Sequence, residues 1–212
     1  MTKKQRAALA VDALEHEYPD AVCSLESCNP LQLLIATRLS AQCTDARVNL
    51  VTPALFERFP TVEAFAEGPV EDIENLIRSC GLYKTKARDI HKMCIELLNR
   101  YNGQVPDTLE DLLTLPGVGR KTANLVLGDV YGKPAVVADT HCIRISNRLG
   151  LCDTKDPYKV EIQLREILPP EKSNDFCHRL VLHGRAVCDA RNPKCEACCM
   201  QSFCKMAVSL KS

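Results

Sequence analysis

The sequence predicts an all-α protein, and two observations carry that prediction. Apolar residues recur at helical spacing, as in Leu31, Leu34, Ile35 and Leu39, while the strict alternation typical of strands is nearly absent. Helix start signals are frequent along the chain, so the regular structure is expected to consist of roughly ten short helices.

The expected helix starts use three kinds of local signal: an Asn or Asp before Pro, a capping box and a Ser-Asn pair. They fall at Asn29-Pro30, Asp107 with Glu110, Asp156-Pro157 and Ser173-Asn174. The apolar segment 134–138 reads either as a strand or as an extended crossover between two helical halves, and we favour the crossover.

Composition places the chain among soluble globular proteins, with 46% hydrophobic and 25% charged residues in 212. Lys and Arg number 27, and so do Asp and Glu. A strongly basic nucleic-acid binder is therefore excluded, and any contact with DNA must be local. No stretch approaches the roughly 18 apolar residues that span a membrane, so we expect a cytoplasmic, monomeric protein with no membrane partner.

The chain has 13 cysteines, and an odd number without a secretory signal argues against a disulfide framework. Seven are scattered singly through apolar segments and are expected to be small core residues. Six fall between Cys177 and Cys204. Of these six, Cys177 is expected in the core, and Cys199 cannot share one metal with its neighbour Cys198.

The remaining four cysteines, Cys188, Cys195, Cys198 and Cys204, lie within 17 residues, with six, two and five residues between successive members. Structural zinc usually draws on two separated knuckles or on a Cys/His mixture, so a [4Fe–4S] cluster fits this compact group better. Zinc is the main alternative, and chance clustering is a weaker one.

A second motif, residues 112–124, places a helix, a tight Pro-Gly-x-Gly turn and another helix in sequence. Gly117 and Gly119 permit positive φ, and the helix N-terminus that follows offers backbone N–H groups and a favourable dipole to a phosphate. An ordinary αα corner is the alternative, and Lys121 taken alone reads as a solvated lysine. Asp139 precedes another helix as an N-cap, where an ionised carboxylate also suits a developing sugar cation.

Together these motifs resemble the iron–sulfur, endonuclease III branch of the helix-hairpin-helix DNA glycosylase superfamily, over about Arg6 to Cys204. Residues 115–124 are similar to its hairpin with the catalytic lysine, 139–141 to its catalytic aspartate segment, and 39–45 to its DNA-probing segment.

The resemblance implies two helical lobes with a DNA-binding cleft between them. One is a six-helix barrel at 23–133, with the hairpin at about 108–131. The other comprises 1–22 and 134–212, with the cluster loop at 188–204.

The implied activity is that of a bifunctional base-excision repair enzyme acting on oxidised pyrimidines of the thymine glycol type in duplex DNA. Lys121, neutralised by its surroundings, would attack C1′ and form a Schiff base, after which β-elimination cuts the strand on the 3′ side. Asp139 would stabilise the cationic sugar.

The resemblance also implies a set of DNA contacts. Gln42 and Leu82 would fill the space left by a flipped nucleotide and wedge the opposite strand; the alternatives are a surface amide and a buried leucine. The hairpin, His141 and two loop cations complete the set, which comprises Gln42, Leu82, Gly117, Val118, Gly119, Arg120, His141, Arg191 and Lys194. Cys43 and Asn192 depart from the pattern and leave damage choice and the loop contacts open.

Three other functions remain open at this stage. A related adenine glycosylase lacks the lysine and carries a further domain. A pyrimidine-dimer glycosylase/lyase would use the same residues on another lesion. A non-catalytic DNA-binding or redox-sensing module would keep hairpin and cluster without needing both Lys121 and Asp139.

Overall fold

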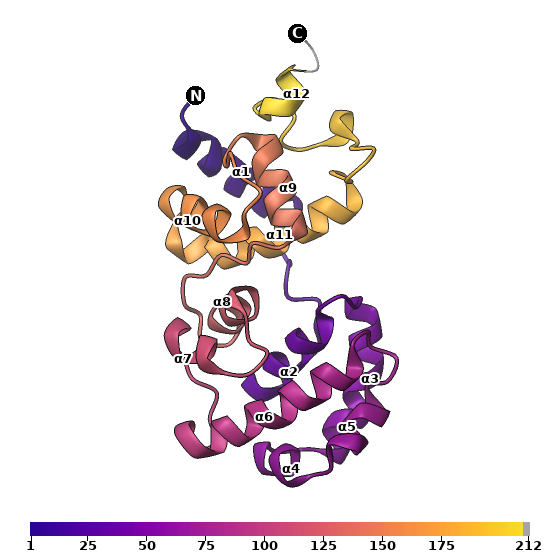
Figure 1. Cartoon of the computed structure of the whole chain (residues 1–212). Helices are drawn as coiled ribbons and strands as arrows, with labels where there is room; N and C mark the ends of the chain where they lie inside the picture. The colour runs from indigo at the N-terminus through magenta and orange to yellow at the C-terminus, as the bar shows by residue number, and fades with distance from the viewer. Residues whose placement is uncertain (210–212) are drawn as a thin grey trace. The chain divides into compact units, whose positions relative to one another are not determined.

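The structure, a computed structural model of the chain, describes residues 1–209, and all regular structure in that range is helical (Figure 1). The predicted all-α fold is therefore confirmed. The chain divides into two compact units, one formed by residues 24–131 and the other by residues 1–23 with those from Gly132 onward.

The unit of residues 24–131 contains seven helices: α2 (Pro30–Ser40), α3 (Asp45–Arg58), α4 (Val62–Glu67), α5 (Val70–Leu76), α6 (Tyr83–Tyr101), α7 (Leu109–Thr114) and α8 (Arg120–Asp129). Helix α6 packs against α2, α4 and α5, and α2 in turn packs against α3 and α8. The buried face of α6 repeats every three or four residues, at Lys86, Ala87, Ile90, Met93, Cys94 and Leu97. This spacing is that of an amphipathic helix around which a core assembles.

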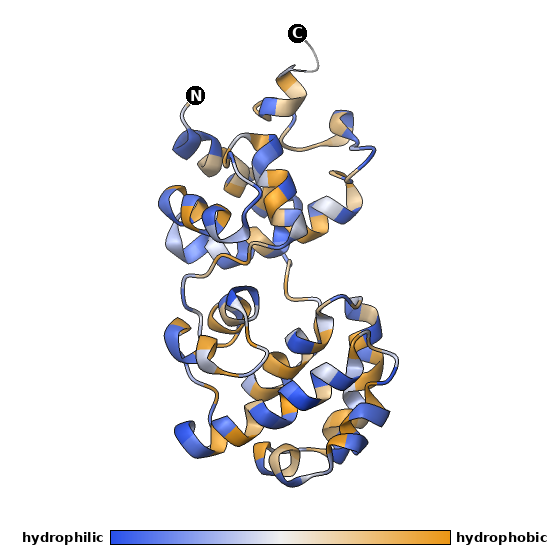
Figure 2. Ribbon diagram, in the orientation of Figure 1, coloured by the Kyte–Doolittle hydropathy of each residue, from blue (hydrophilic) through white to orange (hydrophobic). Residues whose placement is uncertain are grey.

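The other unit contains α1 (Lys3–Glu17), α9 (Thr140–Leu149), α10 (Pro157–Ile167), α11 (Ser173–Ala186) and α12 (Lys205–Ser209), with 3₁₀ turns at Pro170–Lys172 and Cys195–Ala197. Helix α11 packs against both α1 and α9. Hydrophobic and hydrophilic residues alternate around the helices of each unit (Figure 2). Each unit thus has a core of its own, built from apolar helix faces.

Three of the four expected helix starts are confirmed, at Asn29, Asp156 and Ser173. The side chain of Asn29 accepts from the Gln32 N–H at α2, and Asp156 caps α10. The Asp107–Glu110 capping box is wrong by one residue, because Thr108 caps α7 and accepts from the Asp111 N–H. Ser173 does begin α11, but without a side-chain cap, since a 3₁₀ turn leads directly into that helix.

The segment 134–138 has no regular secondary structure, and Ala135, Val136 and Val137 within it are buried. The extended crossover is therefore confirmed and the strand alternative is wrong. Its three apolar side chains explain why the sequence looked strand-like: they are buried without any strand pairing.

The structure joins none of the 13 cysteines in a disulfide. Among the seven scattered ones, Cys80, Cys94, Cys142 and Cys152 are buried as predicted. The core assignment is wrong for Cys28, which is exposed in the loop before α2, and only partly right for Cys23 and Cys43. Cys177 is buried in α11, as expected.

Candidate active site and metal centre

The turn between α7 and α8 depends on Gly117, whose φ is +75°. A Cβ at this position would also lie 2.9 Å from the Asp89 Cβ, so any other residue would be both strained and crowded. Gly119 does not use this freedom, since it has φ −99° and serves as the N-cap of α8. A Cβ on Gly119 would meet nothing within 4 Å, so the space beside this residue is open.

The first turn of α8 has no side-chain cap hydrogen bond. The N–H groups of a helix start need partners, and Gly119 at the N-cap has no side-chain oxygen to offer them. Lys121 is the second residue of this helix, and its side chain is exposed. Arg120 is half-buried, whereas Val118 is buried and its N–H donates to the Leu115 carbonyl.

An ion pair that the sequence did not reveal packs against the turn between α7 and α8. The Arg38 guanidinium in α2 donates to the Asp89 carboxylate in α6 through Nε at 3.1 Å and Nη2 at 2.5 Å. Arg38 Nε would also lie 2.6 Å from a Cβ on Gly117. The turn therefore rests directly on this pair, which joins residues 51 positions apart and leaves no local sequence signal.

Two neighbouring loops of the same unit each present a strained residue. Gln42 has φ +54° and Leu82 has φ +60°, in the left-handed region that residues other than glycine rarely adopt. Both side chains are exposed, 58% for Leu82, so its alternative reading as a buried leucine is wrong. A Cβ on Gly81 would lie 3.3 Å from the Gln42 carbonyl oxygen, so the two loops run close together. Such strain gathers at functional positions.

Beneath these loops lies Lys86, a fully buried lysine that the sequence analysis missed. Its Nζ donates to the Leu39 carbonyl at 2.7 Å, at the end of α2 just before the Gln42 loop. Burial lowers the pKa of Lys86, and the thiols of Cys43 and Cys80 act in the opposite direction. Lys86 thus ties the start of α6 to the end of α2, a contact visible only once the helices are packed.

In the other unit, Asp139 is the N-cap of α9, as predicted: its Oδ1 accepts from the Cys142 N–H at 2.7 Å. The residue is half-buried, and one carboxylate oxygen is committed to this bond. Two residues on, His141 is also half-buried, and its Nδ1 lies 3.1 Å from Nη2 of Arg144.

Arg144 is a second residue that the sequence analysis missed. Besides contacting His141, its Nη2 donates to the carbonyls of Gly184 at 3.3 Å and Cys188 at 3.0 Å. A Cβ on Gly184 would come within 2.9 Å of this same nitrogen, so glycine is what allows α11 to approach α9 here. Arg144 therefore connects the segment of Asp139 to the first cysteine of the C-terminal loop.

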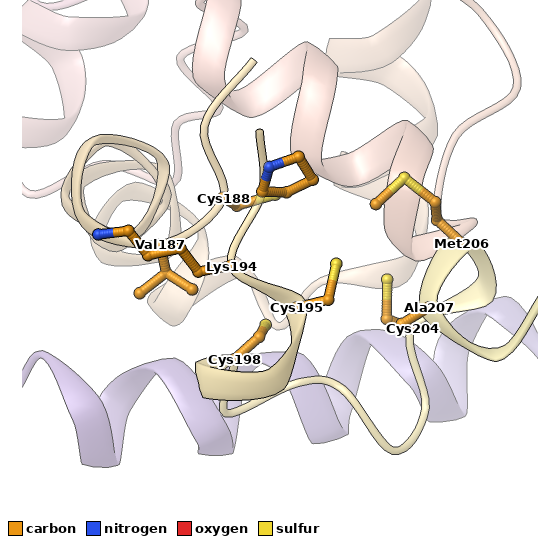
Figure 3. A pocket seen from close by; sticks show the side chains of 9 residues that line it. Val187, Cys188, Lys194, Cys195, Cys198, Cys204, Met206 and Ala207 are labelled. Carbon is orange, nitrogen blue, oxygen red and sulfur yellow. The ribbon is translucent and has the colours of Figure 1, made fainter. Parts of the chain in front are cut away.

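One hollow is lined by all four predicted ligands, Cys188, Cys195, Cys198 and Cys204, together with Met206 and Ala207 of α12. Figure 3 shows the side chains of Cys195 and Cys204 side by side, with Cys198 nearby on the same loop. Among residues 1–209, no group of His, Cys, Asp and Glu side chains is arranged to hold a single metal ion.

The surroundings of this hollow disfavour thiolates that lack a bound cation. Burial, followed by the charges of Cys188, Cys198 and Cys204, raises the pKa of Cys195. Four ionised thiols therefore need a cationic partner, and metal ions supply that charge. A further residue that the sequence analysis missed is Arg148, whose Nη1 donates to the Cys188 Sγ at 3.2 Å and to the Asp189 carbonyl at 2.6 Å.

The chain matches two family models: that of the HhH-GPD superfamily base excision DNA repair proteins over residues 35–170, and the iron–sulfur binding domain of endonuclease III over residues 188–204. Endonuclease III of Synechocystis is 47% identical over 207 residues, covering 97% of this chain and 94% of the relative. That of Escherichia coli K12 is 40% identical and covers 97% of each. The chain belongs to the endonuclease III family.

A solved structure agrees with this assignment. The trapped endonuclease III–DNA covalent intermediate superposes with a TM-score of 0.93, at 44% identity and with complete coverage of both chains. The predicted family, helix-hairpin-helix fold and [4Fe–4S] cofactor are therefore confirmed. Between Met1 and Ser209, no helix is both long and apolar enough to span a bilayer.

The two cations that were predicted to contact DNA from the cluster loop, Arg191 and Lys194, are both exposed. The Arg191 backbone N–H donates to the Asp189 carboxylate at 2.8 Å. Lys194 is more constrained, because its Nζ donates to the Ala186 carbonyl at 3.2 Å.

Proposed function

We propose that this chain excises oxidised pyrimidines of the thymine glycol type from duplex DNA and then nicks the resulting abasic site through a lysine Schiff base. One observation carries the proposal: an exposed lysine stands in the first turn of a helix whose N-terminus follows a Pro-Gly-x-Gly turn and lacks a side-chain cap. The same position can bind a phosphate and deliver an amine to the neighbouring sugar.

Lys121 acts as the nucleophile in this scheme. Its amine attacks C1′, the bond from C1′ to the damaged base breaks, and the base leaves with the electron pair and takes up a proton. The lysine nitrogen then gives up a proton, and the ring oxygen takes one up as the sugar ring opens. The product is a Schiff base between Lys121 and C1′. Removal of a C2′ proton then expels the 3′ phosphate, and water hydrolyses the imine to regenerate the lysine. The solved covalent endonuclease III–DNA intermediate supports a mechanism with an enzyme nucleophile.

Asp139 stabilises the positive charge that develops on the sugar as the base departs. One of its oxygens is held by the Cys142 N–H, which fixes the carboxylate and leaves the other oxygen for the sugar. A carboxylate positioned in this way needs no reorganisation when charge develops, which is the main source of electrostatic catalysis.

Backbone amides and only a few charged side chains hold the DNA in this scheme. The amides at Gly117, Gly119 and Arg120 bind a backbone phosphate, and Arg191 and Lys194 add two phosphate contacts from the cluster loop. Gln42 and Leu82 occupy the space of the flipped nucleotide, since chemistry at C1′ is blocked inside a stacked duplex. This distribution explains how a chain of net charge zero binds DNA locally.

The cluster bound by Cys188, Cys195, Cys198 and Cys204 supplies a structural clamp for the loop, because base hydrolysis and β-elimination transfer no electron. Its thiolates draw together segments on either side of the 3₁₀ turn at Cys195–Ala197, and the loop then presents its cations. We place the protein in the cytoplasm, at the nucleoid, where its duplex substrate lies.

Borohydride trapping tests the proposal directly. Reduction of the Schiff base on a duplex with one thymine glycol should give a covalent adduct with the parent chain and none with Lys121→Gln, while an undamaged duplex gives none. Lys92→Gln, an exposed lysine of α6 in the same unit, is the matched control and should trap normally. Without its nucleophile, cleavage should fall about 10⁴-fold or more.

Trapping on a cyclobutane pyrimidine-dimer duplex instead of thymine glycol would keep Lys121 as the nucleophile and overturn the substrate class. No adduct from iron-replete parent protein on either lesion would overturn the lyase mechanism altogether. Undiminished cleavage by folded Lys121→Gln would remove this lysine from the site.

A further inference from the structure

The proposed cluster ligand Cys198 is in contact with a buried histidine that the repair mechanism does not use. His183 of α11 is 1% exposed, and its Nε2 lies 3.4 Å from the Cys198 Sγ. Its main-chain carbonyl accepts from the N–H of Cys188 at 2.8 Å, where α11 ends. One residue therefore contacts two of the four cysteines, through its side chain and its backbone.

The other ring nitrogen of His183 also has a partner. The Tyr18 hydroxyl, at the end of α1, lies 3.2 Å from Nδ1, and the two rings meet edge to face at 5.8 Å between centroids. Burial, followed by the nearby charges of Glu17, Cys199 and Cys198, raises the pKa of Tyr18 to about 12. At neutral pH its hydroxyl is therefore protonated and available to donate.

The chemistry of a metal ligand fixes the direction of both bonds. A cysteinate bound to iron has no proton, so a hydrogen bond with His183 exists only if Nε2 carries the proton and donates. The neutral ring then has a lone pair at Nδ1, which accepts from the Tyr18 hydroxyl. The thiolate itself favours a proton at Nε2, and the Tyr18 hydroxyl adds to that preference by donating to Nδ1.

We propose that Tyr18 and His183 act together as a positioning pair that supplies an N–H···S hydrogen bond to the Cys198 thiolate and so raises the reduction potential of the cluster. Hydrogen bonds to ligand sulfurs withdraw electron density and stabilise the reduced form, and outer partners that orient a histidine tune a metal site in this way. Arg148 supplies the corresponding donor to Cys188 from another helix. The pair is a property of the cluster environment and acts independently of Lys121 chemistry.

The test is the midpoint potential of the one-electron [4Fe–4S]³⁺/²⁺ couple in the full, iron-loaded chain without DNA, with the electrode as the electron partner. Tyr18→Phe and His183→Leu should both shift the potential downward. His183→Gln should restore it toward the parent value, because its amide can donate to Cys198 from about the same place. Tyr158→Phe, a 52% exposed tyrosine of α10, is the matched control and should leave it unchanged.

A second readout keeps the test decisive if His183→Leu fails to bind iron. Resonance Raman bands of the Fe–S(Cys) stretches should shift in D₂O for the parent chain, and this isotope shift should be smaller in Tyr18→Phe. A merely structural role for the pair would change thermal stability without moving either readout. Potentials equal to the parent in both Tyr18→Phe and His183→Leu, or an unchanged isotope shift in Tyr18→Phe, would overturn the proposal.

Discussion

The helices α8 and α9 begin in opposite ways, although each carries a proposed catalytic residue at its start. At α9 the Asp139 carboxylate caps the helix and accepts from the Cys142 N–H at 2.7 Å. At α8 the N-cap is Gly119, with no side-chain hydrogen bond at all. A side-chain cap begins α9, whereas α8 begins at glycine, which is common at N-caps but has no side-chain oxygen to bond to the helix amides. The missing side-chain cap at α8 is therefore the more informative feature, because no N-cap oxygen competes with a ligand there.

The largest effect is expected from a substitution that keeps helix capping at residue 139 and removes the negative charge of Asp139. Asparagine caps a helix about as well as aspartate does, so Asp139→Asn should change stability by less than about 0.5 kcal/mol. It removes the charge, however, and base excision on thymine glycol duplexes should slow by about 10² to 10³-fold. Single-turnover excision and thermal unfolding measured on the same preparation give both numbers.

Asp156→Asn provides the matched control, because Asp156 caps α10 in the same unit and accepts from the Lys159 N–H at 2.9 Å. It should leave both excision and stability near the parent values. If the two variants lose activity alike, the charge of Asp139 has no special part in the reaction and its role is capping alone.

The converse change gives α8 the cap that it lacks. Gly119→Asp fits, because a Cβ there meets nothing within 4 Å and the backbone is in an ordinary conformation. It should stabilise the chain by a few tenths of a kcal/mol while weakening binding to a duplex with an abasic-site analogue by about tenfold, since the carboxylate competes with phosphate for the amides. Fluorescence anisotropy measures the binding.

Gly119→Ala adds the Cβ without the carboxylate and should bind almost as the parent does. If Gly119→Asp binds DNA as tightly as Gly119→Ala, the amides of α8 are not a phosphate site. Chemical denaturation of both variants checks that the difference arises from binding rather than folding.

The two glycines of the hairpin should also behave differently from each other. Gly117→Ala forces a side chain into positive φ and against Arg38 and Asp89, so we expect a loss of about 1 to 3 kcal/mol of unfolding free energy. Gly119→Ala should cost well under 1 kcal/mol. Urea denaturation followed by circular dichroism decides this, and equal losses would mean that the turn conformation does not depend on Gly117.

The sequence could predict those parts of the fold and site that are encoded locally. The starts of three helices can be predicted from their N-cap residues Asn29, Asp139 and Asp156, because each cap accepts from an amide only three residues away. The spacing of the four cysteines and the Pro-Gly-x-Gly turn are local in the same sense. Even here the detail could fail: Thr108 rather than Asp107 caps α7, since both are good caps in adjacent positions.

What the sequence could not predict are contacts between distant segments. Arg144 and Arg148 look like ordinary surface residues of α9, yet they donate to the loop that begins at Cys188, some 40 residues on. Lys86 would be assigned to the surface by its charge and is instead fully buried beneath the Gln42 loop. Packing decides these roles, and no periodicity or spacing records it.

The smallest effect is expected from a test of whether cationic side chains add to the phosphate binding proposed for the α8 amides. Arg191→Gln with Lys194→Gln removes two exposed loop cations, and the salt dependence of binding should become shallower by about two units of slope. At moderate salt, affinity should fall only severalfold, and equally for damaged and undamaged duplexes, because phosphate contacts carry no sequence or lesion information. Lys155→Gln with Lys159→Gln, near the start of α10, is the control. A slope unchanged from the parent would confine phosphate binding to backbone amides, as the open start of α8 suggests.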